Sequence, residues 1–274
     1  MSKPGGVSGR WVAVSSAAAV LVGVLATAGC GGREQTGQMI VSYGEATTPT
    51  AVRGRTLMQN ARLLEDLAID VNDSLELPYD VTLAGVQCGE ANAYWSSGDR
   101  KITICYEDAE MSLRLFEADP NYAEDPAHAA INATIATFFH EVGHAVISVY
   151  QLPVTGREED VADQLAAFAI LEPDDVLKDK AFLDPAKAVE DFAVMFKLYA
   201  AARGGVDQSD FAAVHSLNET RMYNLKCWIY GSDPTAHAAM VTDGLLPADR
   251  AARCPNEYRQ LVSAWTRLLA PHLK

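Results

Sequence analysis

Short alternating runs of apolar residues predict strands in the first half of the chain. The segments 39–43 (MIVSY) and 79–88 (YDVTLAGVQC) alternate as strands do. The segments 91–95 (ANAYW) and 100–106 (RKITICY) flank the turn SSGD, which predicts two strands around that turn. A small sheet is therefore expected in this part of the chain.

Helical periodicity dominates the remainder of the sequence. The segment 56–75 places leucines and alanines on one face, which predicts a single amphipathic helix, and 107–119 predicts a second. A longer helix is expected from about Pro126 to just before Pro153, with an apolar stripe that steps by three and four residues. Further helices are expected at 158–171, 186–203, 217–230 and 255–270. Strands followed by helices indicate an α+β fold in one domain, residues 38–274.

The first 29 residues predict a signal peptide of the lipoprotein type. Lys3 and Arg10 precede an apolar stretch of small residues, and LATAGC, which ends at Cys30, resembles a bacterial lipobox. Cys30 is thus the expected lipidation site, and residues 30–37 are the expected tether. We expect export and a lipid anchor to the cell membrane; the alternative is plain cleavage and free secretion, with Cys30 as a spare thiol.

Charge and cysteine content narrow the picture further. The 274 residues have a formal net charge of -14, which argues against a nucleic-acid partner because such binding needs a basic surface. Four cysteines remain after Cys30, and an even number in an exported chain indicates disulfides. Cys88 and Cys105 lie at the outer ends of the predicted hairpin, so we pair them, which leaves Cys227 with Cys254.

One motif with metal-site spacing lies in the long predicted helix. The stretch TFFHEVGHAVISVY contains His140, Glu141 and His144 in the order H-E-x-x-H. Residues four apart share a helix face, so the two imidazoles can reach one ion, and Glu141 can reach a water on that ion. The alternative is a buried histidine pair with a purely structural role.

The next predicted helix offers a third ligand. Glu159 and Asp163 are also four residues apart in EEDVADQLA, so Glu159 can bind the ion while Asp163 accepts the free N–H of a ligand histidine. The alternative is an acidic helix start that faces solvent and interacts with the helix dipole, a role we expect for Glu158.

These motifs resemble those of the zincin peptidases, of the gluzincin kind. The E-x-x-A-D pattern is similar to that of the bacterial heat-shock membrane proteases and CaaX proteases. The fuller pattern resembles a bacterial family of metallopeptidases known as a domain of unknown function. Three stretches carry this resemblance: CGEANAYW…ITICYE, HEVGHAVI…LPVTGREEDVADQLAA and RMYNLKCWIYGSDP. The resemblance covers about 38–269 and implies a zincin-like fold, a zinc cofactor and a peptide or protein substrate.

The implied reaction needs further groups around the metal. With Glu141 as general base, the developing oxyanion needs a donor besides zinc, and we favour His215, then Tyr223, with Arg221 as a further candidate. His215 could instead cap a helix, and Tyr223 could be a core residue. The strand from Asn92 through Ala93 and Tyr94 to Trp95 could pair with an extended substrate.

Two functions remain open at the level of the sequence, and a weaker third is a peptidase that acts on peptidoglycan cross-links. The first is an exported zinc metallopeptidase that hydrolyses peptide bonds. The second is a non-catalytic envelope lipoprotein of the same fold that binds a peptide or partner. The presence of Glu141 favours the first, because a structural metal site has no use for a base at that position.

Overall fold

The computed structural model describes residues 36–172 and 184–274. The predicted signal peptide, the lipidation site Cys30 and most of the predicted tether lie outside these described residues. Gly37, the last residue of that tether, already pairs with the domain, because its N–H donates to the carbonyl of Leu77 over 2.7 Å.

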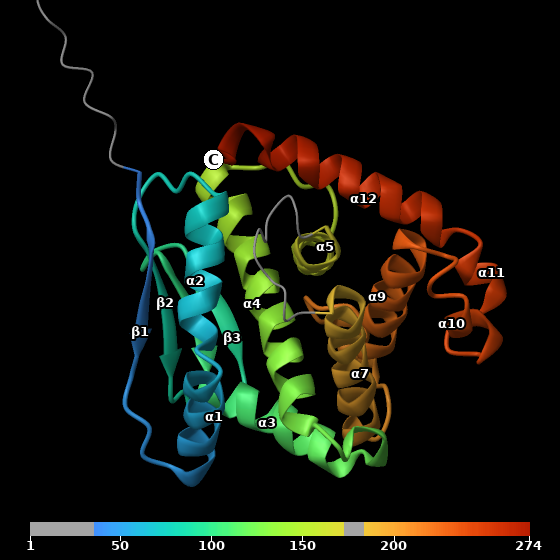
Figure 1. Cartoon of the computed structure of the whole chain (residues 1–274), viewed down its shortest axis with the longest axis horizontal. Coiled ribbons are helices and arrows are strands. Elements are labelled where there is room, and N and C mark those ends of the chain that lie inside the picture. The colour runs from blue at the N-terminus through green and yellow to red at the C-terminus, as the bar shows by residue number, and fades with distance from the viewer. Residues whose placement is uncertain (1–35, 173–183) are drawn as a thin grey trace, which may run out of the picture. The chain divides into compact units, whose positions relative to one another are not determined.

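A four-stranded mixed sheet forms one side of the domain (Figure 1). The strands are β1 (Met39–Tyr43), β2 (Val81–Val86), β3 (Ala93–Ser96) and β4 (Lys101–Cys105), in the order β1-β2-β4-β3. β2 runs parallel to both β1 and β4, while β3 and β4 form the predicted antiparallel hairpin. β3 is therefore an edge strand, as the substrate-pairing hypothesis requires.

The single helix expected at 56–75 is wrong, because the chain forms two helices there. α1 (Pro49–Asn60) begins earlier, where the Thr48 side chain accepts from the N–H of Ala51, and α2 (Leu63–Ser74) follows. Arg62 separates them with a φ of 51°, a left-handed conformation that interrupts the helix. The break lets α1 pack on the helix α3 (Tyr106–Ala118) while α2 packs on β1 and β2.

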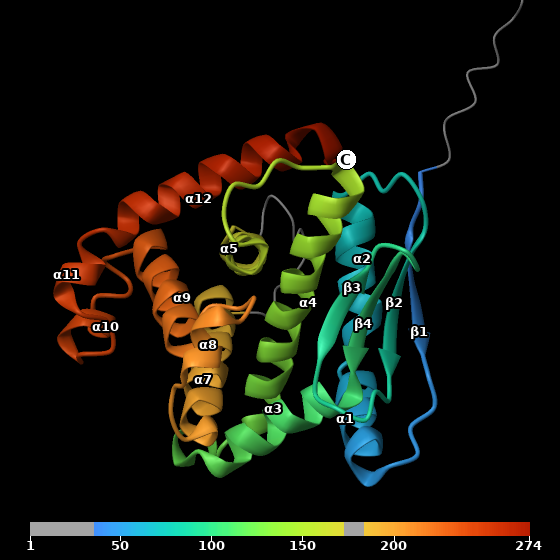
Figure 2. The same cartoon turned by 180° about the vertical axis from the view of Figure 1, so that it is seen from behind.

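The long helix α4 (Pro126–Tyr150) is the central element of the domain. It lies between the sheet and the later helices and contacts α3, β3 and the helices that follow it (Figure 2). The predicted stripe accounts for only part of its burial: Phe138 and its neighbour Phe139 are both fully buried on different faces. Most side chains in the middle of α4 are thus held in place from several sides.

Helices complete the C-terminal part, so the predicted α+β class is confirmed. The long ones are α5 (Glu158–Leu171), α7 (Pro185–Arg203), α9 (Asn218–Ser232) and α12 (Cys254–Leu269). Three short helices were not predicted: α8 (Gln208–Ala212), α10 (Ala239–Thr242) and α11 (Ala248–Ala251). In the parts of the chain that the structure describes, no helix is long and apolar enough to span a membrane.

Both predicted disulfides are formed. Cys88–Cys105 closes the base of the hairpin, with the two Cα atoms 5.5 Å apart. Cys227–Cys254 joins α9 to the first residue of α12, with a Cα separation of 5.1 Å. The first bridge therefore constrains the edge strand that lies beside α4.

Candidate metal centre

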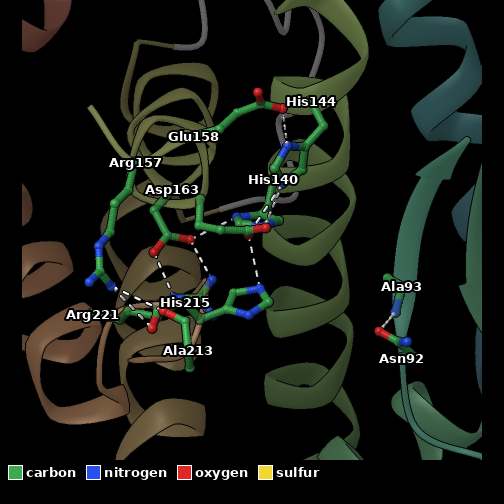
Figure 3. A network of polar contacts seen from close by, with 11 residues as sticks. Asn92, Ala93, His140, His144, Arg157, Glu158, Asp163, Ala213, His215 and Arg221 are labelled. Atoms are coloured by element: carbon green, nitrogen blue, oxygen red, sulfur yellow. Dashed lines mark hydrogen bonds and ion pairs between the residues drawn. The ribbon is translucent and has the colours of Figure 1, made fainter. Parts of the chain in front are cut away.

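His140 and His144 present their imidazoles together on α4 (Figure 3). Their Nε2 atoms are 3.3 Å apart, as expected for residues one helical turn apart that turn toward the same point. His140 is 5% exposed, whereas His144 is partly open to solvent.

Helix α5 brings Glu159 to the same point. Its Oε2 atom lies 3.2 Å from Nε2 of His140 and 3.3 Å from Nε2 of His144. A tetrahedral ion with metal–ligand distances of about 2.0–2.1 Å has ligand atoms about 3.3–3.4 Å apart. The three donor atoms are therefore spaced as three ligands of one tetrahedral ion would be.

Carboxylates lie behind both histidines. Nδ1–H of His140 donates to Oδ1 of Asp163 over 2.8 Å, and Nδ1–H of His144 donates to Oε1 of Glu158 over 2.8 Å. These bonds place the proton on Nδ1 and leave the Nε2 lone pairs for a metal. Asp163 has the contact expected from the sequence, but Glu158, expected only as a solvated helix start, also orients a histidine.

The charge around the site suits a cation. Burial alone would lower the pKa of His140, but its hydrogen bonds to Asp163 and Glu159 raise that pKa to about 9. Burial would raise the pKa of Glu159, yet its contacts with His140, His144 and His215 hold it far below its usual range. A divalent ion replaces these protons as the positive charge among the same donors, so metal uptake should release protons.

Arg221 supports Asp163 from α9. Its Nε donates to Oδ2 over 2.7 Å and its Nη2 donates to Oδ1 over 2.6 Å, while its guanidinium lies 3.9 Å from the ring centroid of Phe196. Burial would raise the pKa of Asp163, but the positive charge of Arg221 keeps it well below its usual range. Arg221 thus holds the carboxylate behind His140 rather than standing free as an oxyanion donor.

Glu141 is buried beside the histidines, with 5% of its surface exposed. Burial raises the pKa of its carboxyl group, while the positive charge available on His140 and His144 and the N–H of Trp95 act in the opposite sense. A rise in the pKa of a carboxylate makes it a better proton acceptor, which suits a general base.

The structure brings His215 to the site but not Tyr223. Nε2 of His215 lies 2.9 Å from Oε2 of Glu159, and the imidazole is half exposed on the loop that precedes α9. Tyr223 is 39% exposed with Lys226 near its ring. Side chains two positions apart on a helix point to nearly opposite sides. Because Arg221 faces Asp163, Tyr223 faces away from the site.

Two adjoining cavities meet at His140 and Glu141. One, of about 360 Å³, extends past His144, Glu158 and Glu159 and is bordered by Asn92 and by residues 93–95 of the edge strand. The other, of about 180 Å³, extends inward toward α3 and α7. Asn92, Ala93 and Tyr94 thus border the site, as predicted for a strand that pairs with substrate.

Paired histidines on one helix, a carboxylate from the next and a buried glutamate define a candidate metal-dependent hydrolase. The chain belongs to the family described as "Putative metallopeptidase", whose model matches residues 43–269. This match confirms the resemblance inferred from the sequence. Comparisons with curated proteins and with solved structures gave no match.

Proposed function

We propose that the protein is an exported zinc-dependent metallopeptidase that hydrolyses peptide bonds. The observation that carries this proposal is the triangle of donor atoms from His140, His144 and Glu159, with edges of 3.2–3.3 Å. Two imidazoles and one carboxylate are a donor set that suits catalytic zinc, which keeps its fourth position for water. Bound there, zinc would activate a water molecule at neutral pH and polarise the substrate carbonyl.

The protein's own groups would move the proton and position the substrate. Glu141 accepts a proton from the attacking water and delivers it to the leaving amine, which its raised pKa favours. His215, half exposed beside Glu159, would donate to the oxyanion, whereas Tyr223 lies away from the site and would take no part. An extended peptide adds to the edge strand β3, so that its backbone pairs beside Asn92 and Ala93.

The location outside the cytoplasm belongs to the same proposal. Residues 1–29 direct export, and Cys30 carries the lipid that anchors the domain to the membrane. Disulfides support an oxidising compartment, because they persist mainly in exported proteins.

A second candidate function rests on the position of His215. One ring nitrogen each of His215 and His140 and a Glu159 oxygen lie within 4.8 Å of one another, so His215 could serve as a further protein ligand. Structural zinc sites are closed by protein ligands, whereas catalytic sites keep a position open. With His215 on the metal, the protein would be a non-catalytic module that binds a peptide or partner.

Metal analysis combined with peptide cleavage tests the proposal. The purified domain should contain one zinc per chain and cleave members of an unbiased peptide library. Chelation should abolish cleavage, and zinc should restore it. If the zinc-loaded wild type cleaves no peptide but the His215→Ala variant does, His215 closes the metal site. If neither protein cleaves a peptide, the result argues against a peptidase.

A further inference from the structure

The inner cavity contains a buried carboxylate that the proposed reaction does not use. Asp108, in the first turn of α3, lines this cavity together with Glu141 and is only 8% exposed. Its Oδ2 atom is buried without a hydrogen-bond partner among the described residues. A buried carboxylate with an oxygen that lacks a partner is costly, so a positive charge placed close to Asp108 would stabilise the site.

The walls of the cavity suit a hydrocarbon chain. Met111, Phe192, Met195 and Phe196 line it, and Tyr199 contributes a phenol that interacts electrostatically with Asp108. The volume of about 180 Å³ is below the roughly 300–1,000 Å³ of pockets for drug-sized ligands, so one side chain is the appropriate occupant.

The charges that face the cavity favour a cation. Asp108 and Glu141 contribute two carboxylates, and the guanidinium of Arg221 is already paired with Asp163 through two hydrogen bonds. His140 and His215 also line the cavity, but each directs its Nε2 atom to Glu159. Because Oδ2 of Asp108 is covered, its carboxylate offers the cavity at most one oxygen. One oxygen suits the compact charge of an ammonium group better than a guanidinium, which prefers two.

We propose that this cavity is a specificity pocket for a lysine side chain of the substrate, whose ammonium group pairs with Asp108. The alkyl part of the lysine packs between the methionine and aromatic side chains, as long basic side chains do on apolar surfaces. The cavity shares Asn92, Ala93 and Glu141 with the outer cavity, so a peptide paired with β3 can place one side chain inward. This inference rests on the proposed peptidase function and specifies its substrate.

Cleavage profiles of matched peptides test the pocket. Peptides with lysine, norleucine or glutamate at each position around the scissile bond are compared, because norleucine retains the alkyl chain without the charge. At one position, the zinc-loaded wild type should cleave lysine peptides with a kcat/KM at least tenfold above that for norleucine peptides. Asp108→Asn should reduce this ratio to about one, whereas Asp249→Asn, which removes an exposed carboxylate on α11, should retain it.

A second variant guards against misfolding of the first. Asp108→Leu replaces the carboxylate with an apolar side chain and should invert the ratio in favour of norleucine. Circular dichroism and melting curves of both variants show whether the folded domain is being compared.

The results separate this inference from the proposed function. An active wild type without a lysine preference, or with a preference that folded Asp108 variants retain, overturns the inference and leaves the peptidase proposal standing. If the wild type cleaves nothing, the peptidase proposal fails, and binding to the zinc-loaded domain decides the pocket. Tighter binding of lysine than norleucine peptides, lost in Asp108→Asn, supports the pocket, and equal binding overturns it.

Discussion

At the scale of single residues, the site depends on carboxylates that lie behind the metal donors. Asp163 and Glu158 each accept the Nδ1–H of one histidine, and Arg221 fixes Asp163 in turn. His140 and its partner Asp163 are buried, whereas Glu158, the partner of His144, is half exposed. Residues that only orient ligands should therefore contribute less to metal affinity than Glu159, which supplies a donor atom itself.

Comparison of two adjacent glutamates tests this ranking. Glu159→Ala removes a proposed ligand and should lower zinc affinity by more than 100-fold, because a three-donor site becomes a two-donor site. Glu158→Ala removes only the acceptor for His144 and should cost about 10–100-fold, the usual effect of losing such a partner. Competition with a chromogenic chelator measures both; equal losses would contradict the assignment of Glu159 as a ligand.

The buried Asp108 should make stability depend on pH. Burial, with a smaller contribution from Glu141, raises the pKa of Asp108 from 3.8 to about 6. The folded state therefore binds this proton more tightly than the unfolded state, so the stabilisation is complete below about pH 4 and is lost as pH rises through about 6. Two pKa units correspond to roughly 2–3 kcal/mol.

Urea unfolding of the wild type and Asp108→Asn at pH 4 and pH 7 isolates this effect. The free energy of unfolding of the wild type should fall relative to that of the variant between the two pH values, by roughly 2–3 kcal/mol. Both proteins should carry the same metal content in the comparison. Parallel pH profiles would show that Asp108 is not protonated preferentially in the folded domain.

Local spacing explains which site residues the sequence could predict. Helical spacing places His140 and His144 on one face of α4 and Glu159 and Asp163 on one face of α5. The sequence therefore predicts these pairs, together with Glu141 beside the first histidine. The pairing of Arg221 with Asp163 spans 58 residues and depends on how α9 packs. The isolation of Asp108 in a cavity likewise depends on tertiary packing, and no local pattern indicates it.

At the scale of elements, a close approach of α4 and α5 sets the geometry of the site. Gly143 lies where the helices meet, and a Cβ atom there would be 2.8 Å from the Cα of Ala162. Ala162 is fully buried at this contact, and Ala166, one turn further along α5, is buried as well. The small residue between the two histidines is thus needed for Glu159 to reach them.

Gly143→Ala should weaken zinc binding without altering any ligand. The added methyl group must push α5 away from α4, and this moves Glu159 from the histidines, although alanine by itself favours a helix. Gly156→Ala, in the loop before α5 with open space around it, is the matched control. We expect at least a tenfold loss of zinc affinity for the first variant only; similar affinities would mean that the helix contact yields without moving Glu159.

Helices and strands with a strong local pattern could be predicted, whereas features that depend on tertiary packing could not. The long helices and the hairpin have strong local periodicity, and their bounds were predicted to within a few residues. The break at Arg62 had no such signal, since the apolar spacing continues across it and only the different packing partners of α1 and α2 require it.

At the scale of the whole molecule, the order of strands and helices along the chain indicated the α+β class. The parallel pairing of β2 with both β1 and β4 could not be predicted, because it depends on contacts between distant segments. The resulting sheet leaves β3 at the edge beside α4, which is the arrangement that a substrate-binding strand needs.

The lipid anchor is a prediction about the whole chain that concerns residues outside the described part. Cys30→Ser should release the protein from the membrane fraction while the soluble domain retains its melting temperature and both disulfides. Fractionation of cells and mass spectrometry of the mature N-terminus measure this. An unmodified N-terminus in the wild type, with the protein in the soluble fraction, would indicate plain secretion.

Replacement of Glu141 by glutamine is the sharpest probe of its proposed role as the base of a zinc peptidase. Glutamine retains the size of the side chain but cannot accept the proton. Since Glu141 is not a proposed ligand, zinc content should remain at one per chain, and kcat for a cleaved peptide should fall by about 10²–10⁴-fold with little change in peptide binding. Unchanged cleavage in the zinc-loaded variant would contradict the account.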